Sequence, residues 1–283
     1  MADTRQPDET IMSGDGEAGL VSLGPIWLVG CGNMGRAMLD GWLAGGVPAG
    51  SLTVINPSPR VLPAGVGFAS APSAALPRPA IIVLAVKPAR LAAAAPILAP
   101  FATGTLLLSV LAGARLERLS ALFADARVLR ALPNTPARIR QGITLLAGTA
   151  PAADDRAAAA TLMGTFGTTH WIAESEFDTA TAIASSSPAW LFRWIGALAR
   201  AGAEMGLDSA VAATLALEAT AGAAAYARAA GRPLPDLARE VASPGGMTQA
   251  GLDVLDAGDA LAALMLGVAR SAIERAQTLA QEA

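Results

Sequence analysis

The sequence predicts an α/β fold in which a doubly wound parallel sheet is followed by an all-α helical domain. Three observations support this. From Pro25 onward, short apolar runs alternate with longer alanine-rich stretches, which is typical of buried parallel strands and the helices that connect them. A glycine-rich turn at residues 30–35 follows the first run. Beyond Phe177 the strand pattern disappears, and only helical stretches follow.

The apolar runs of the first part are uninterrupted, as expected of strands covered by helices on both sides. The stretches between them suit crossover helices. Strands are predicted at residues 26–29, 52–55, 81–86, 106–110 and 128–131, with 144–147 a sixth candidate and a last strand around 169–172, and helices at 35–44, 89–98 and 116–123.

The second part predicts helices whose faces are apolar nearly all round. A lone bundle of this size cannot bury such faces, so we expect a homodimer formed through this domain. The predicted domains are residues 1–23 as a disordered tail, 24–175 as the sheet domain and 176–283 as the helical domain. Helices are predicted at residues 177–184, 188–205, 209–229, 234–241, 247–255 and 257–281.

The composition excludes several classes of function. At 283 residues the chain suits two domains, and 53% hydrophobic residues supply ample core material. A formal net charge of −3 offers no basic stripe for nucleic acid. One cysteine, Cys31, excludes an internal disulfide, and with one histidine, His170, no protein-built metal site is expected.

No segment is expected to direct the chain to a membrane. Residues 1–23 are rich in Asp, Glu, Gly and Ser and lack the basic start and apolar core of a signal peptide. Residues 91–114 carry no charge and match a membrane span in length, but Pro96, Pro100 and Gly104 interrupt them. We therefore expect a cytoplasmic protein.

The single lysine and the three asparagines stand out by their positions. Asn33, Asn56, Lys87 and Asn134 each lie where an apolar run gives way to a turn. Asparagine is common in turns for local reasons, yet ligands of open parallel sheets bind at the carboxyl ends of the strands. Four such residues in one half of the chain favour a binding site.

The turn G-C-G-N-M-G, between a predicted strand and a helix, has the spacing of a dinucleotide-binding fingerprint. Gly30 permits the tight turn, Gly32 lets a diphosphate approach the backbone, and Gly35 lets helix and strand pack closely. The helix N-terminus adds a partial positive charge, worth about 0.3–1 kcal/mol to an anion. The sheet is therefore predicted to be a Rossmann-type domain, with Asn33 and Met34 also at the cofactor.

The end of the second strand indicates which dinucleotide binds. An NAD-specific protein usually has Asp or Glu there, about twenty residues after the glycine turn. Asn56, Ser58 and Arg60 supply instead an amide, a hydroxyl and a cation, none of which repels a 2′-phosphate. This favours NADPH, with NADH as the alternative, although Arg60 also fits a plain surface arginine.

Six motifs, taken in order, resemble the pyrroline-5-carboxylate reductase family over residues 25 to about 257. The resemblance implies a dinucleotide-binding domain followed by a helical dimerisation domain, with dimers that often assemble further. It also implies reduction of 1-pyrroline-5-carboxylate to L-proline by NADPH or NADH, the last step of proline biosynthesis. The motifs are G-C-G-N-M-G, V-I-N-P-S, L-A-V-K-P, R-A-L-P-N-T-P, S-S-S-P-A-W and V-A-S-P-G-G-M-T.

The resemblance also implies site residues by position. One set is expected at the nicotinamide end of the cofactor, and a second set is expected to hold the substrate. The first comprises Ala85, Val86, Lys87 with Pro88, and Asn134 with Pro133, and the second Ser186, Ser243, Gly245, Gly246 and Thr248.

The chain departs from the family pattern in three places. S-S-S-P-A-W stands where the family usually has G-S-G-P-A-Y, Met247 where a small residue is usual, and Ala219 where glutamine is usual. Altered bulk at these places leaves the ring size of the imine open. A sister imine reductase acting on 1-pyrroline-2-carboxylate or a piperideine carboxylate stays an alternative.

The chemistry expected of the P-G-G-M-T turn is binding and positioning. Successive N–H groups there can capture a carboxylate, although an ordinary helix start capped by Ser243 is the alternative. Thr248 is the candidate that hydrogen-bonds the imine nitrogen or orients a water. No histidine or acid is an obvious proton donor, so positioning carries most of the catalysis, roughly 7–11 kcal/mol at best.

Lys87 has two interpretations. As a catalytic residue, its ammonium assists the cofactor or the substrate carboxylate, and as a structural residue it bonds carbonyl groups at the strand end. Other reductase classes fit poorly, because Tyr226 is followed by Ala230 rather than by a lysine and no lysine lies beyond residue 87. A non-catalytic NADP-binding protein stays a further alternative.

Overall fold

The structure, a computed structural model, describes residues 23–282. The described residues form two compact units, one comprising residues 23–185 with 273–282 and the other Ser186–Ala272. The predicted tail lies outside the described residues except for Leu23. The two units meet at residues 185–186, and the functional domain boundary predicted at residues 175–176 stays a prediction.

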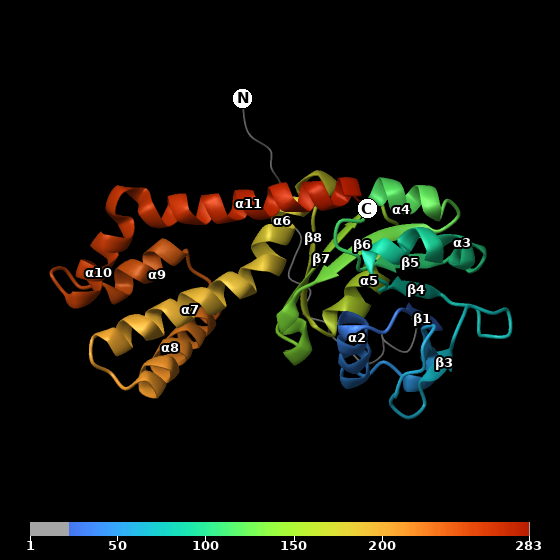
Figure 1. Cartoon of the computed structure of the whole chain (residues 1–283), viewed down its shortest axis with the longest axis horizontal. Helices are drawn as coiled ribbons and strands as arrows, with labels where there is room; N and C mark the ends of the chain where they lie inside the picture. The colour runs from blue at the N-terminus through green and yellow to red at the C-terminus, as the bar shows by residue number, and fades with distance from the viewer. Residues whose placement is uncertain (1–22, 283) are drawn as a thin grey trace. The chain divides into compact units, whose positions relative to one another are not determined.

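The first unit is built on one eight-stranded sheet in the order β3-β2-β1-β4-β5-β6-β7-β8 (Figure 1). β1 pairs in parallel with β2 on one side and with β4 on the other. The winding of the chain therefore reverses at β1, which confirms the predicted doubly wound fold. The strands are β1 (Ile26–Val29), β2 (Leu52–Ile55), β3 (Gly67–Ala69), β4 (Ile81–Leu84), β5 (Leu106–Ser109), β6 (Arg127–Pro133), β7 (Gly142–Gly148) and β8 (Gly167–Trp171).

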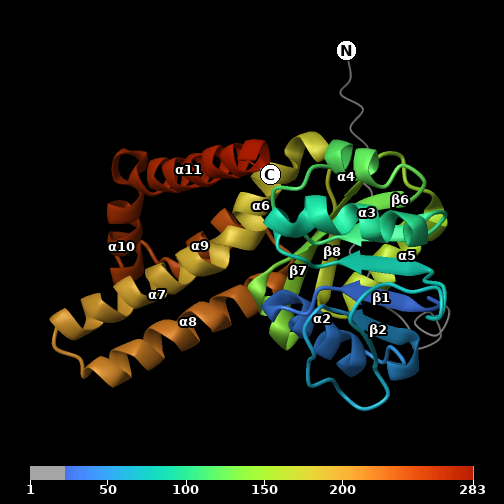
Figure 2. The same cartoon turned by 45° about the vertical axis from the view of Figure 1, so that its right-hand side comes forward.

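Helices cover both faces of this sheet (Figure 2). α2 (Asn33–Ala44) and α5 (Ala153–Gly164) contribute to one core, which Leu28 of β1 enters. α3 (Leu91–Ala102) and α4 (Leu116–Leu122) contribute to the other, which Trp27 enters. Each large apolar side chain buried in this way contributes about 1.5–3 kcal/mol, which explains why the strands are continuously apolar.

Two features of the sheet differ from the prediction. β6 and β7 pair antiparallel, because residues 134–141 are too few for the crossover of about a dozen residues that parallel strands need. The sheet is therefore mostly, not entirely, parallel. β3 was missed because it is a short edge strand in which Gly67 and the exposed Phe68 form no apolar run.

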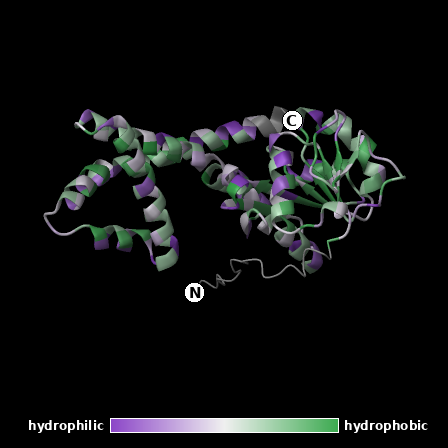
Figure 3. Ribbon diagram, turned by 90° about the horizontal axis from the view of Figure 1, so that it is seen from below, coloured by the Kyte–Doolittle hydropathy of each residue, from purple (hydrophilic) through white to green (hydrophobic). Residues whose placement is uncertain are grey.

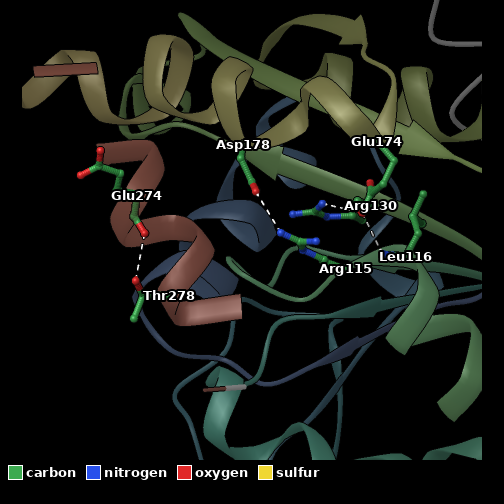
Figure 4. Close-up of polar contacts among 7 residues, drawn as sticks. All are labelled: Arg115, Leu116, Arg130, Glu174, Asp178, Glu274 and Thr278. Carbon is green, nitrogen blue, oxygen red and sulfur yellow. Dashed lines mark hydrogen bonds and ion pairs between the residues drawn. The ribbon is translucent and has the colours of Figure 1, made fainter. Parts of the chain in front are cut away.

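A partly buried charged cluster joins the sheet to α6 (Phe177–Thr181), as Figure 4 shows in part. The guanidinium of Arg130, on β6, lies 3.8 Å from the ring centre of Phe177 and donates to Glu174 at 2.8 Å. Burial lowers the pKa of Arg130, and the neighbouring Glu174 opposes that effect. Asp178 pairs with Arg115 at 3.5 Å. The start of α6 is thus fixed to the sheet.

The second unit is helical. α7 and α8 pack against each other, and Asp208 caps α8 by accepting the N–H groups of Ala210 and Val211 at 3.0 and 3.1 Å. The helix predicted at 257–281 begins at Ala260 rather than at residue 257, because Gly258, with a φ of 61°, kinks the chain before it. The helices are α7 (Ser187–Glu204), α8 (Ser209–Ala230), α9 (Leu234–Val241), α10 (Met247–Asp256) and the first part of α11 (Ala260–Glu282).

This helical unit buries few of its apolar side chains, and Figure 3 shows hydrophobic residues along its helices. Ala212, Ala216 and Leu237 are its buried hydrophobic residues within the described chain. α8 is long and apolar enough to cross a membrane by length and composition alone. Large exposed apolar side chains include Leu191, Phe192, Trp194, Leu198, Leu215, Leu217, Val254 and Leu264.

Candidate functional site

The glycine turn after β1 has the geometry that a nucleotide cradle needs. Gly30 has a φ of +93°, and a Cβ there would lie 2.6 Å from the carbonyl oxygen of Ala85. A Cβ on Gly35 would collide with the carbonyl oxygen of Gly30. A Cβ on Gly32 would meet nothing within 4 Å. Two glycines therefore permit close packing, and the third faces open space.

The loop after β2 is held at both ends. The side-chain oxygen of Asn56 accepts the N–H of Cys31 at 3.2 Å, and its amide nitrogen donates to the carbonyl of Ser58 at 2.7 Å. At the other end, Arg36 of α2 donates to the carbonyl oxygen of Val61 at 2.8 Å. The loop is therefore fixed against the glycine turn by hydrogen bonds within the chain.

A pocket of about 560 Å³ lies beside the glycine turn. Its lining comes from that turn, the loop after β2, the segments after β3 and β4, and one side of α3. The structure thus brings together most of the predicted cofactor residues from separate parts of the chain. They are Gly30, Gly32, Asn56, Ser58, Arg60, Ala85, Val86 and Lys87.

The charge of this pocket is uniformly positive. Arg60, Lys87 and Arg90 line it, and no Asp or Glu does. Within residues 23–282, none of the three takes part in an ion pair. The first turn of α2 also contains no acidic residue. A pocket with unpaired cations beside a helix N-terminus suits an anionic ligand.

Some lining residues were missed by the sequence analysis. Ala93, Ala94 and Ile97 line the pocket from one side of α3, and Arg90, the residue directly before α3, lines it with them. Their spacing of three, four and seven residues is the signal that would have found them, because it places side chains on one helix face. Cys31 also lines the pocket, and burial raises the pKa of its thiol.

Three other predicted cofactor residues lie at the first turn of α2 but do not line the pocket. Asn33 and Met34 are exposed there. Gly35 is buried behind the turn, where it permits the close packing described above. Direct contact of Asn33 or Met34 with the cofactor stays a prediction.

Asn134 also lies outside the pocket lining and has a structural role. Its side-chain oxygen accepts the N–H of Ile143 at 2.9 Å, and its amide nitrogen donates to the carbonyl of Ala184 at 2.9 Å. Ala184 belongs to a π-helix at Ala182–Ser186. Asn134 therefore ties the end of β6 to both β7 and this π-helix, and its cofactor contact stays a prediction.

Lys87 lies in the segment that follows β4, directly before a 3-10 helix. Its carbonyl accepts the N–H of Arg90 at 2.8 Å, which starts a 3-10 helix at Pro88–Arg90. Its side chain is exposed, and its ammonium makes no hydrogen bond or ion pair within the described part of the chain. The structural interpretation, in which the ammonium bonds strand-end carbonyls, therefore finds no support.

The predicted substrate turn lies in the second unit, before α10. Gly245 has a φ of +69°, and the N–H of Gly246 donates to the carbonyl of Ser243 at 2.9 Å. α10 begins after Gly246 without a side-chain cap, so the alternative in which Ser243 caps the helix is wrong. Thr248 is exposed, and so is Met247, at 91%. The helix start is open to an anion.

The end of α9, just before this turn, is tied to α8. Tyr226 of α8 donates to one carboxylate oxygen of Glu240 at 2.7 Å, and Arg232 donates to the other. The hydrogen bond from Tyr226, followed by Arg232, lowers the pKa of Glu240. Ser186, the remaining predicted substrate residue, is the last residue of the π-helix and directly precedes α7. Such π-helical turns are frequent at functional sites.

The sheet order, the glycine turn and the cationic pocket define a Rossmann-type oxidoreductase with a helical second part. The family model described as pyrroline-5-carboxylate reductase dimerisation matches residues 174–279. The model described as NADP oxidoreductase, coenzyme F420-dependent, matches residues 25–113. The first match covers the helical part of the chain, and the second covers the sheet from β1 to β5.

Individual relatives share most of the chain. Pyrroline-5-carboxylate reductase 2 of Bacillus subtilis (strain 168) is 33% identical over 239 residues, 81% of this chain and 86% of the relative. The Pseudomonas aeruginosa pyrroline-5-carboxylate reductase is 32% identical over 266 residues, 91% of this chain and 97% of the relative. The solved pyrroline-5-carboxylate reductase of Coxiella burnetii superposes with a TM-score of 0.85 at 28% identity, covering 91% of this chain and 99% of that one. The chain belongs to the pyrroline-5-carboxylate reductase family.

Proposed function

We propose that this chain reduces 1-pyrroline-5-carboxylate to L-proline with NADPH, as a cytoplasmic enzyme of proline biosynthesis that binds neither membranes nor nucleic acid. The observation that carries the proposal is the pocket at the glycine turn, whose charged lining residues are all cations. Membership of the family supplies the substrate, because the relatives with most of the chain in common are named for this reaction.

The residues around the pocket fit a phosphorylated dinucleotide, which supplies the hydride when bound. The open space over Gly32 admits a diphosphate to the backbone. Ser58 and Arg60, on the loop that Asn56 holds, face the pocket with a hydroxyl and a cation. Because no carboxylate lines the pocket, nothing there repels a 2′-phosphate, and NADPH is preferred to NADH.

The turn before α10 fits the substrate. Its free N–H groups, with the helix dipole behind them, bind the carboxylate of the imine. The hydroxyl of Thr248 holds the imine nitrogen by a hydrogen bond, directly or through a water. The imine is basic enough to take its proton from solvent, so these residues act mainly by orienting the ring. Lys87 assists electrostatically from the cofactor pocket.

The helical unit is proposed to pair with a second copy of the chain. Its large exposed apolar side chains are too many for a stable isolated surface. The matched family model, which covers this unit, is described as a dimerisation model. A dimer interface also accounts for the apolar character of α8 without a membrane.

An assay with several imines tests the proposal. Purified protein is mixed with NADPH and, separately, with 1-pyrroline-5-carboxylate, 1-pyrroline-2-carboxylate or a piperideine carboxylate, and the loss of NADPH absorbance is followed. We expect the first substrate to give the highest kcat/KM. A higher kcat/KM for another ring would identify a sister imine reductase, and NADPH binding without turnover of any imine would identify a non-catalytic protein.

A further inference from the structure

We propose that Arg90 is a specificity-determining residue that binds the 2′-phosphate of NADPH together with Arg60. This rests on the proposed function, since it names how the same pocket selects its cofactor. No sequence motif pointed to Arg90, because it lies on the far side of the 3-10 turn that follows β4. The structure places Arg90 in the pocket lining, together with Arg60 and Lys87.

The charges of the pocket exceed those that a diphosphate alone needs. NADPH carries a diphosphate and a 2′-phosphate, and a phosphate monoester bears about −1.5 to −2 charges at neutral pH. NADH carries only the diphosphate. The diphosphate has the glycine turn and the α2 N-terminus to bind it. Three unpaired cations in the same pocket are therefore more than the diphosphate alone requires.

Along the wall of the pocket, cationic side chains precede apolar ones. Lys87 follows Ala85, which packs directly against Gly30 of the glycine turn. Arg90 comes one turn later, and the lining then becomes apolar at Ala93 and Ile97. This order matches the adenosine part of NADPH. There the ribose that carries the 2′-phosphate lies between the diphosphate, expected at the glycine turn, and the adenine, expected at the apolar face.

Both arginines start from fixed backbone. The loop that bears Arg60 is held by Asn56 at one end and by the bond from Arg36 to Val61 at the other. The N–H of Arg90 donates to Lys87 at 2.8 Å, and Arg90 is the residue directly before α3. Two guanidinium groups on rigid supports bind a phosphate with less loss of freedom than flexible ones.

The test compares two nucleotides that differ only in the 2′-phosphate. Binding of adenosine 2′,5′-bisphosphate and of 5′-AMP to the full-length protein is measured by isothermal titration calorimetry. Arg90→Gln is expected to weaken the bisphosphate about 10- to 100-fold, the cost of a charge-assisted hydrogen bond. Binding of 5′-AMP should change by less than about twofold.

Two further variants sharpen the result. Arg118→Gln removes the same charge from α4, outside the pocket lining, and should leave both affinities unchanged. Arg90→Lys keeps a positive charge but loses the planar fork, so it should recover part of the bisphosphate affinity. Circular dichroism checks that each variant is folded.

Three outcomes would overturn the inference. The first is that Arg90→Gln leaves the affinity for the bisphosphate unchanged. The second is an equal loss of affinity for both nucleotides, as expected if Arg90 stacks on adenine. The third is that the unmodified protein does not bind the bisphosphate. The imine assay separates this from the proposed function. Bisphosphate binding that depends on Arg90, in a protein that turns over no imine, would support the inference while the proposed reaction failed.

Discussion

The sheet unit and the helical unit solve the problem of burial in opposite ways. Strands such as β1 place every side chain in one of two cores that belong to the chain itself. The helices of residues 186–272 instead leave large apolar side chains exposed, with Phe192 at 67%. The first unit carries its stability within one chain, whereas the second needs a partner to cover it. Substitutions should therefore act differently in the two.

The largest effect is expected at the exposed face of α7. Phe192→Asp places a charge where the proposed homodimer buries an aromatic ring, and the loss of such an anchor costs about 2–4 kcal/mol of association. Analytical ultracentrifugation should show a shift from dimer to monomer. Phe68→Asp is the matched control, because Phe68 is 41% exposed on the edge strand of the other unit. Equal dissociation by both variants would contradict the assignment of the interface.

The glycine turn should show the next largest effect, and two glycines there separate stability from binding. Gly30→Ala forces a side chain into a positive φ and against the backbone of Ala85, at a cost of about 2–3 kcal/mol. Gly32→Ala adds a methyl group to open space, so stability should hold while NADPH binding falls. Thermal unfolding and calorimetric titration measure the two quantities. Normal NADPH binding by Gly32→Ala would show that the diphosphate does not approach this turn.

Replacement of Asn134 should destabilise the protein more than replacement of Asn33, although the sequence places both where an apolar run gives way to a turn. Asn134→Ala removes two hydrogen bonds to backbone groups and should lower the free energy of unfolding by about 1–3 kcal/mol. Asn33→Ala, at the exposed start of α2, should change it by less than about 0.5 kcal/mol. Urea denaturation of both variants measures the difference. Equal values would mean that the bonds of Asn134 add nothing to stability.

The smallest effect is expected at Glu240, in the helical unit. Tyr226 and Arg232 lower the pKa of this carboxyl group. A lowered pKa in the folded state means that the contribution to stability is present above the pKa of the unfolded chain and is lost as the pH falls through the folded value. Tyr226→Phe should therefore reduce the loss of stability on acidification, measured by thermal unfolding at a series of acidic pH values. An unchanged pH dependence would show that this bond is not formed in solution.

The sequence predicted the fold well where burial dictates the pattern. The strands at 26–29 and 52–55 have the predicted bounds, because a run buried on both faces begins and ends where the core does. β3 escaped detection because an edge strand needs no apolar run. The reversal of β7 was missed because strand direction depends on the length of the connection, not on hydrophobicity.

The candidate site was predictable only in part. Glycine motifs and strand ends can be recognised from residue type and spacing. Gly30, Asn56 and Lys87 were predicted in this way, and the structure brings them together in one pocket. Arg90 was not predicted, because the sequence does not distinguish it from an ordinary surface arginine. Only the fold shows that it lies on the side of the chain that lines the pocket. The bonds of Asn134 to Ala184 likewise join residues far apart in sequence and follow from no local pattern.

The central claim is that the pocket beside β1 holds NADPH for reduction of a cyclic imino acid. A crystal structure of the protein with NADP⁺ and L-proline tests it most directly. We predict the diphosphate over Gly32, the 2′-phosphate between Arg60 and Arg90, and the proline carboxylate on the N–H groups of Met247 and Thr248, which begin α10. A cofactor bound elsewhere, or proline remote from that turn, would contradict it.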